Sequence, residues 1–190
     1  MTMRPIDVSW LRGEYGEECY SFIYIRATPE EVVARLGGRW EGFTPDPLPE
    51  EPDDYPRPGE PLGVTSIGDW TFVFDPDWIG TQEDVITKLS EGTRLVSQAA
   101  LSIKGLDYFH WCENGEIRFC FGCDNEPLEE EPDEIVDVMT EIDKLYPSSS
   151  YFYKGPAFLL VEHLTGIRVT EQLLKSSTFM WGVVPEPSGS

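Results

Sequence analysis

The sequence predicts an α+β fold, in which an antiparallel sheet of about five to six strands packs with four to five helices. Strands and helices are mixed in the first two thirds of the chain, and helical patterns follow alone. The dipeptide Asn114-Gly115 adds a strong signal for an antiparallel hairpin. A chain of 190 residues with 40% hydrophobic residues is long and apolar enough for one folded unit, so we expect a single domain over residues 1–190.

The first elements are a strand and a well-punctuated helix. Residues 19–26 are rich in aromatic and β-branched side chains, which favour a strand. Thr28 is a candidate N-cap, Pro29 suits the first helical position, and Glu31 completes a capping box. Gly37 is expected to end this helix. Its apolar face is expected to consist of Val32, Val33 and Leu36.

Residues 41–62 differ in composition from the segments before and after them. This segment contains seven acids, one arginine and many prolines. Because proline is excluded from helix interiors and central strands, we expect an extended surface loop rich in proline and acid.

The middle of the chain resumes regular structure. Residues 69–74 read as a strand, and the following Asp75-Pro76-Asp77 is expected to stop it. Residues 81–84 resemble a capping box and open a second helix that ends at Gly92. Residues 93–103 offer one or two further strands.

A hairpin centred on Asn114-Gly115 should place Glu113 opposite Glu116. In a regular ladder, one face is then apolar and lies on the core, and the other is mixed and meets solvent or a partner. Trp111 falls on the mixed face with Phe109 and Arg118. Since tryptophan and arginine are common at binding hot spots, Trp111 is a candidate binding residue, although a helix or loop that covers this face within the fold is the favoured explanation.

The last third begins with an acidic segment at 124–134, in which no lysine or arginine occurs. A third helix is expected from about Asp133, with apolar residues at helical spacing up to Leu145. A fourth helix spans about 156–164, and Thr170 is a candidate cap for a short fifth one.

The charge balance restricts the partners. The chain has 35 acidic against 14 basic side chains, a formal net charge of −21. Such a protein repels phosphate backbones and anionic membranes, so we expect no direct nucleic acid binding and no membrane binding. No leader segment and no apolar run near 20 residues is visible, and four cysteines are too few for a disulfide scaffold. We therefore expect a cytoplasmic protein with reduced thiols.

One group of residues has the types that bind zinc. His110, Cys112, Cys120 and Cys123 are in the order of a zinc site, but a regular ladder would point Cys120 away from the other three, and only a bulge would reverse this. Cys120 and Cys123 also have redox spacing, yet redox pairs usually occupy a helix N-terminus. Small buried hydrophobes beside a hydrogen-bonded histidine are the simpler interpretation, so no metal and no cofactor is assigned.

A second group is acidic. Asp69, Asp75 and Asp77 surround one strand and offer the oxygen ligands that magnesium prefers. The alternative is ordinary turn chemistry, because no phosphate-cradling glycine loop accompanies them.

Four blocks of sequence resemble a known family. They are S-F-I-Y-I-R-A-T-P-E-E-V-V-A-R-L-G-G at 21–38, G-D-W-T-F-V-F-D-P at 68–76, L-S-E-G-T-R-L-V-S at 89–97 and L-V-E-H-L-T-G-I-R-V-T-E-Q-L-L at 160–174. They are similar to an uncharacterised actinobacterial family, domain of unknown function 6461, over most of residues 17–184. The resemblance implies a bacterial protein and brings no activity, cofactor or active residue.

The sequence favours a non-enzymatic, acidic protein-binding module, of the immunity or inhibitor type, that neutralises a basic partner. No catalytic residue is assigned, and no oligomeric state follows. Two alternatives stay open: a DNA-mimic regulator of a nucleic-acid-binding protein, and a magnesium-dependent enzyme using Asp69, Asp75 and Asp77. The expected binding residues are Asp53, Asp54, Glu129, Glu130, Glu131, Asp133 and Trp111.

Overall fold

The computed structural model describes residues 2–122, 130–147 and 151–187. In this part of the chain, one antiparallel sheet of eight strands has the order β2-β8-β3-β4-β1-β5-β6-β7. The strands are β1 (Cys19–Ile25), β2 (Thr44–Asp46), β3 (Leu62–Ile67), β4 (Trp70–Phe74), β5 (Arg94–Leu101), β6 (Leu106–Glu113), β7 (Glu116–Phe121) and β8 (Phe179–Gly182). The α+β class is confirmed, and the expected five to six strands are too few.

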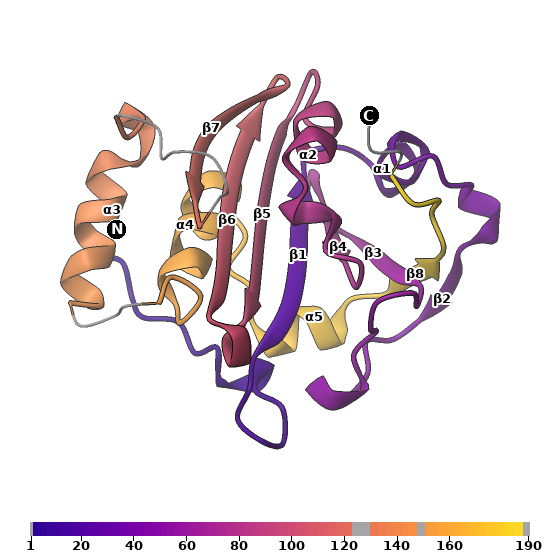
Figure 1. The fold of residues 1–190 in the computed structure, drawn as a ribbon, viewed down its shortest axis with the longest axis horizontal. Helices are drawn as coiled ribbons and strands as arrows, with labels where there is room; N and C mark the ends of the chain where they lie inside the picture. The colour runs from indigo at the N-terminus through magenta and orange to yellow at the C-terminus, as the bar shows by residue number, and fades with distance from the viewer. Residues whose placement is uncertain (1, 123–129, 148–150, 188–190) are drawn as a thin grey trace.

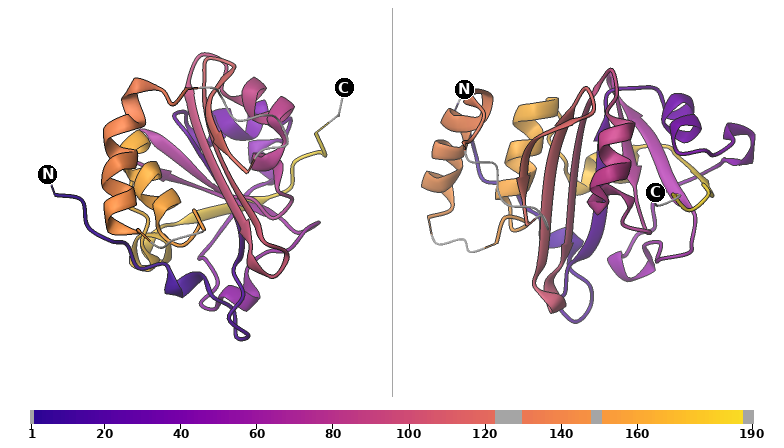
Figure 2. Two further views of the ribbon diagram at one scale, coloured as in Figure 1. Left: turned by 60° about the vertical axis from the view of Figure 1, so that its left-hand side comes forward. Right: turned by 45° about the horizontal axis from the view of Figure 1, so that its top comes forward.

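Five α-helices complete the described fold, and they cover both faces of the sheet (Figures 1 and 2). They are α1 (Pro29–Arg35), α2 (Glu83–Leu89), α3 (Asp133–Leu145), α4 (Pro156–Thr165) and α5 (Glu171–Ser176). Helices α3, α4 and α5 cover one face with a core that contains Phe22, Phe72 and Phe158. Helices α1 and α2 cover the other with a second core around Ile23 and Ile86. The sheet therefore has no solvent-facing side over its central strands.

Local signals in the sequence account well for α1 and α5. Thr28 Oγ1 accepts a hydrogen bond from the Glu31 N–H at 3.2 Å, and Thr170 Oγ1 accepts one from the Leu173 N–H at 3.1 Å. For α2 the expected capping box is wrong. The residue at its N-cap is Gln82, whose side chain makes no capping bond, and Thr81 ends a short 3₁₀ turn instead.

The strands that the sequence did not reveal are β2, β3 and β8. β2 lies inside the proline-rich segment 41–62, where only a loop was expected, and it contains Pro45. Pro45 is tolerated because β2 is the edge strand of the sheet. At an edge, a residue without a backbone N–H need not break a hydrogen bond to a neighbouring strand. β8 is inserted between β2 and β3.

The hairpin forms at the expected place. Asn114 and Gly115 both have positive φ, 53° and 84°, as a two-residue hairpin turn requires, and Glu113 pairs with Glu116. A bulge between Trp111 and Cys112 then shifts the register by one residue. Beyond this bulge, side chains of β7 exchange faces relative to a regular ladder, so the expected division of the hairpin into two faces is wrong there.

Gly63 of β3 leaves room for the ring of Trp181 on the neighbouring strand β8. It pairs with Trp181, and a Cβ at position 63 would lie 2.6 Å from Cζ3 of the Trp181 ring. The ring is held in place because Trp181 Nε1–H donates to the Asp46 carbonyl oxygen at 2.9 Å and the ring stacks on Phe179.

We expect Gly63→Ala to lower the free energy of unfolding by about 1–3 kcal/mol, because the added methyl overlaps a ring that cannot move freely. Chemical denaturation measures this. In a Trp181→Leu background the same substitution should cost much less, and an equal cost in both backgrounds would rule out the ring as the cause.

Candidate functional site

The predicted acidic binding residues lie in two separate places. Asp53 and Asp54 belong to a 3₁₀ turn in the connection from β2 to β3, whereas Glu130, Glu131 and Asp133 lie at the start of α3. Glu129 is outside the described residues. Since β2 is one edge of the sheet and α3 follows the opposite edge strand β7, the two groups do not form the adjacent rows of charge that a DNA mimic needs (Figure 1).

Helix α3 presents the denser of the two acidic surfaces. Its buried side consists of Ile135, Val138 and Ile142. The solvent-exposed carboxylates of the helix and of the residues just before it include what we call the α3 acidic face: Glu130, Glu131, Asp133, Asp137 and Asp143. One basic side chain, Lys144, is exposed on the same helix and forms an ion pair with Glu141. The helical period that places the apolar residues inward places these carboxylates outward.

The α3 acidic face is both prominent and anchored. Helix α4 lies between α3 and the strands, so α3 is the outermost element on this side (Figures 1 and 2). Arg94 of β5 ties the helix to the sheet, because its guanidinium reaches Glu134 Oε1 at 2.8 Å and Glu113 Oε1 at 3.2 Å. Val136 adds an apolar side chain, 41% exposed, between the carboxylates.

Trp111 is not part of any surface. It is fully buried, in the core beneath α3 and α4, with Arg94 5.2 Å and Arg118 5.9 Å from its ring centroid. The expectation that its face meets solvent or a partner is therefore wrong. Both sides of the sheet are covered by helices, which a pattern of alternation along one hairpin does not reveal.

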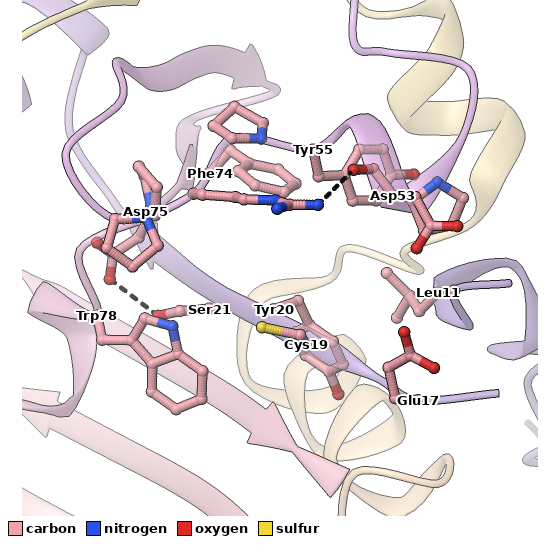
Figure 3. A pocket seen from close by; sticks show the side chains of 16 residues that line it. Leu11, Glu17, Cys19, Tyr20, Ser21, Asp53, Tyr55, Phe74, Asp75 and Trp78 are labelled. Atoms are coloured by element: carbon pink, nitrogen blue, oxygen red, sulfur yellow. Dashed lines mark hydrogen bonds between the residues drawn. The ribbon is translucent and has the colours of Figure 1, made fainter. Parts of the chain in front are cut away.

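A cleft of about 280 Å³ opens at the end of the sheet where β1 begins and β4 ends (Figure 3). Its walls come from these two strands, from residues 11–17 before β1, from the segment that follows β4, and from residues 52–58 of the β2–β3 connection. The charged side chains that line it are Glu17, Asp53, Arg57 and Asp75, and its aromatic side chains include Tyr55, Phe74 and Trp78.

Asp75 is the most unusual residue of the cleft, because it is a carboxylate only 1% exposed. Its Oδ2 accepts hydrogen bonds from the Ser21 hydroxyl and from the Gly80 N–H, both at 2.8 Å. Its Oδ1 is buried and has no hydrogen-bond partner among the described residues. Burial raises the pKa of Asp75 to about 6, although the N–H groups of Gly80 and Ile79 and the Ser21 hydroxyl oppose this rise.

The segment after Asp75 is held in a strained conformation. Trp78 has φ 58° and ψ 33°, the left-handed region that bulky side chains avoid. Its carbonyl oxygen accepts bonds from the N–H and the hydroxyl of Thr81, at 3.1 and 2.8 Å. Strain of this kind persists where surrounding contacts enforce it, and such positions concentrate at functional sites.

Cys19 also lines the cleft, yet it is poorly suited to nucleophilic chemistry. It is a free thiol, and burial raises its pKa, which the charge of Arg57 offsets only in part. A thiol becomes a strong nucleophile when its pKa is lowered. The cleft thus holds carboxylates and a thiol, and this thiol is not activated as a nucleophile.

The three aspartates of the magnesium alternative are not brought together. Asp69 precedes β4 and Asp75 follows it, so roughly 20 Å of extended chain separates them. The Asp77 carboxylate accepts a bond from the Gly59 N–H at 2.8 Å and thereby closes a loop. Within the described ranges, no three histidine, cysteine or acidic side chains are arranged to hold a metal ion.

The histidine–cysteine group is brought closer together than a regular ladder allows. The bulge places His110 directly opposite Cys120, so the expectation that Cys120 points away is wrong. His110 is 1% exposed and lies 3.7 Å from Glu83 Oε1. Cys112 is a buried free thiol, and burial raises its pKa to about 12. Cys120 is disulfide-bonded, which contradicts the expectation of reduced thiols at this residue, and Cys123 lies outside the described residues.

Only part of these candidate sites could be predicted from the sequence. The sequence marks Asp75 as a turn residue. Its burial follows from the packing of residues 79–81 against β1 and β5, where Ser97 Oγ donates to the Gly80 carbonyl oxygen at 2.6 Å. The outward carboxylates Asp137 and Asp143 could have been found, because they have the complementary phase to the apolar residues of the same helix.

Comparison with known proteins identifies a family of unknown function. A model described as "Family of unknown function (DUF6461)" matches residues 1–188. The comparisons with curated proteins and with solved structures return no match. Among the described residues, none of the helices combines the length and the apolar character needed to cross a membrane.

Proposed function

Because the chain belongs to DUF6461, a family of unknown function, we propose its role from geometry: it is a non-enzymatic module that binds and neutralises a basic protein partner through the α3 acidic face. The observation that carries the proposal is that α3 is the outermost helix on its side of the molecule (Figure 2) and that its exposed residues are mostly acidic. Asp53, Asp54 and Trp111 are not part of this surface.

The physics of such a surface favours fast and selective association. Carboxylates on one exposed helix face, in a protein of net charge −21, attract a basic surface over several ångströms and exclude acidic competitors. Val136 supplies apolar area in the middle of the patch. A polar surround with a small apolar centre is the usual anatomy of a specific protein interface.

The anchoring of α3 supports the same proposal. Arg94 bridges Glu113 of the sheet and Glu134 of the helix, so the acidic face is held in position before a partner arrives. A preformed surface avoids the entropy that a mobile segment loses on binding.

The proposal also covers the biological role and the cellular location of the protein. We propose an immunity-type or inhibitor role, which rests on the acidic surface and on the lack of catalytic motifs in the sequence. We also propose a place in the cytoplasm of an actinobacterium, which the resemblance of the sequence implies. Cysteine usage does not carry this placement, since Cys120 is disulfide-bonded. Fractionation of the native host, followed by detection of the chain, tests it directly.

The binding experiment compares two triple variants of equal charge. Asp133→Asn, Asp137→Asn and Asp143→Asn together remove three carboxylates from the α3 acidic face. Asp46→Asn, Asp84→Asn and Glu91→Gln remove three exposed carboxylates elsewhere. We expect the first set to weaken the affinity for the partner captured from the host by about ten- to a hundredfold, mostly through the association rate, and the second set to have little effect.

Surface plasmon resonance at two salt concentrations reads out both sets. Wild-type association should slow as salt rises, and the α3 variant should lose most of that dependence. Equal losses for the two sets would show that only net charge matters, and an unchanged affinity for the α3 set would overturn the proposal.

A further inference from the structure

The cleft beside β1 and β4 is not used by the proposed α3 interface and lies outside it. Its base contains an acceptor that the described protein does not satisfy, since Asp75 Oδ1 is buried and lacks a partner among the described residues. A buried carboxylate oxygen without a donor is costly, and the cost is removed when a ligand supplies an N–H.

The charged residues of the cleft favour a ligand with a positive charge. Glu17, Asp53 and Asp75 contribute three carboxylates, and Arg57 is the one cation among the described residues that line it. Arg57 is exposed, and its Nη2 donates to the Asp53 carbonyl oxygen at 3.3 Å. The excess of carboxylates favours a cation over an anion.

The walls favour an organic cation over a metal ion. Tyr55, Phe74 and Trp78 present aromatic rings at the same cleft, and Figure 3 shows them around the space that Asp75 borders. Aromatic faces attract ammonium and guanidinium groups, particularly where water is excluded. Hard metal ions require several converging oxygen ligands, and the described residues offer no such group.

The strained backbone at Trp78 and the buried carboxylate of Asp75 belong to one structural unit. The segment that holds Trp78 at φ 58° also contains Gly80, whose N–H binds Asp75 Oδ2. The contacts that enforce an unfavourable backbone therefore also orient the carboxylate. Strain maintained beside an unsatisfied acceptor is typical of a preformed ligand site.

We infer that this cleft binds a small organic cation, an alkylguanidinium or alkylammonium compound, whose N–H group donates to Asp75 Oδ1 and whose charge lies against the Trp78 ring. The site goes beyond the proposed partner interface, because it uses none of the residues of the α3 acidic face.

The test is isothermal titration calorimetry of the full chain with agmatine, which has a guanidinium and an ammonium group. We expect saturable binding to the wild type. Asp75→Asn should weaken it at least tenfold, because the charge is lost while the side chain keeps its shape. Trp78→Gly should weaken it similarly while the backbone is relieved of strain, so that the variant stays folded.

Two further variants make the outcome decisive. Arg57→Gln removes the opposing cation and should tighten agmatine binding severalfold, whereas a site for anions or zwitterions would lose affinity. Glu51→Gln removes an exposed charge next to the cleft that is not in its lining, and it should leave binding unchanged.

Three results would each overturn the inference: no heat with agmatine, equal weakening by Glu51→Gln and Asp75→Asn, or binding of inorganic phosphate that depends on Arg57. Circular dichroism of each variant separates lost binding from lost folding. Because the α3 variants are tested with a protein partner and these with agmatine, failure of one proposal is distinguishable from failure of the other.

Discussion

Trp111→Ala should lower the free energy of unfolding by about 3–5 kcal/mol, the largest loss we expect from a single substitution. Trp111 is the largest fully buried side chain of the described structure, and truncation leaves a cavity that the surrounding helices and strands fill only in part. The loss also exposes Arg94 and Arg118 to a void in place of the ring they flank. Urea denaturation, followed by far-ultraviolet circular dichroism, gives the value.

The same substitution separates a core role from a binding role. A core tryptophan leaves partner affinity intact in the fraction that stays folded, and Trp111→Phe should recover much of the stability. If Trp111→Ala instead kept its stability and lost partner binding, the burial of this residue in the working state would be contradicted.

Asp75→Asn should change how stability depends on pH. Folding raises the pKa of Asp75 from the ordinary 3.8 to about 6, so the folded state holds this proton more tightly than the unfolded chain does. The stability contributed by protonation is complete below pH 3.8 and is lost as pH rises through about 6. That difference corresponds to roughly 3 kcal/mol.

Asparagine does not titrate, so the variant lacks this loss. Between about pH 4 and pH 8, the difference in unfolding free energy should move in favour of Asp75→Asn by up to roughly 3 kcal/mol. Denaturation curves at intervals across this range measure the trend. Asp69→Asn, an exposed aspartate at the other end of β4, serves as the control and should follow the wild-type profile. Parallel profiles for Asp75→Asn and wild type would refute the assignment.

Local signals predicted the elements that local forces determine. Helix α1 has its cap, proline and first-turn acids within a few residues, and the hairpin turn needs only Asn114 and Gly115. The bulge after Trp111 is different, because it depends on how β6 and β7 fit the layers above and below them. A shift of one residue there reverses the faces of Phe119 and Cys120, which no pattern within the strand indicates.

The candidate sites divide in the same way. The outward charges of α3 follow from helical phase and were partly predicted through Asp133. The state of Asp75 depends on contacts with Ser21 and Gly80, which are distant or non-helical neighbours, and a sequence of Asp-Pro-Asp looks like any exposed turn. Burial of one polar atom is a tertiary property, so only the structure reveals it.

The insertion of β8 between β2 and β3 has a consequence for the order of assembly during protein synthesis. Among the strands that the structure describes, β2 pairs only with β8, and β8 is made after all the others. Before β8 has been synthesised, the edge of β3 that later pairs with β8 has unpaired N–H and C=O groups. At this stage β2 also has no strand to pair with. This half of the molecule therefore closes only when residues 179–182 have left the exit tunnel, and until then its open edge is available to chaperones.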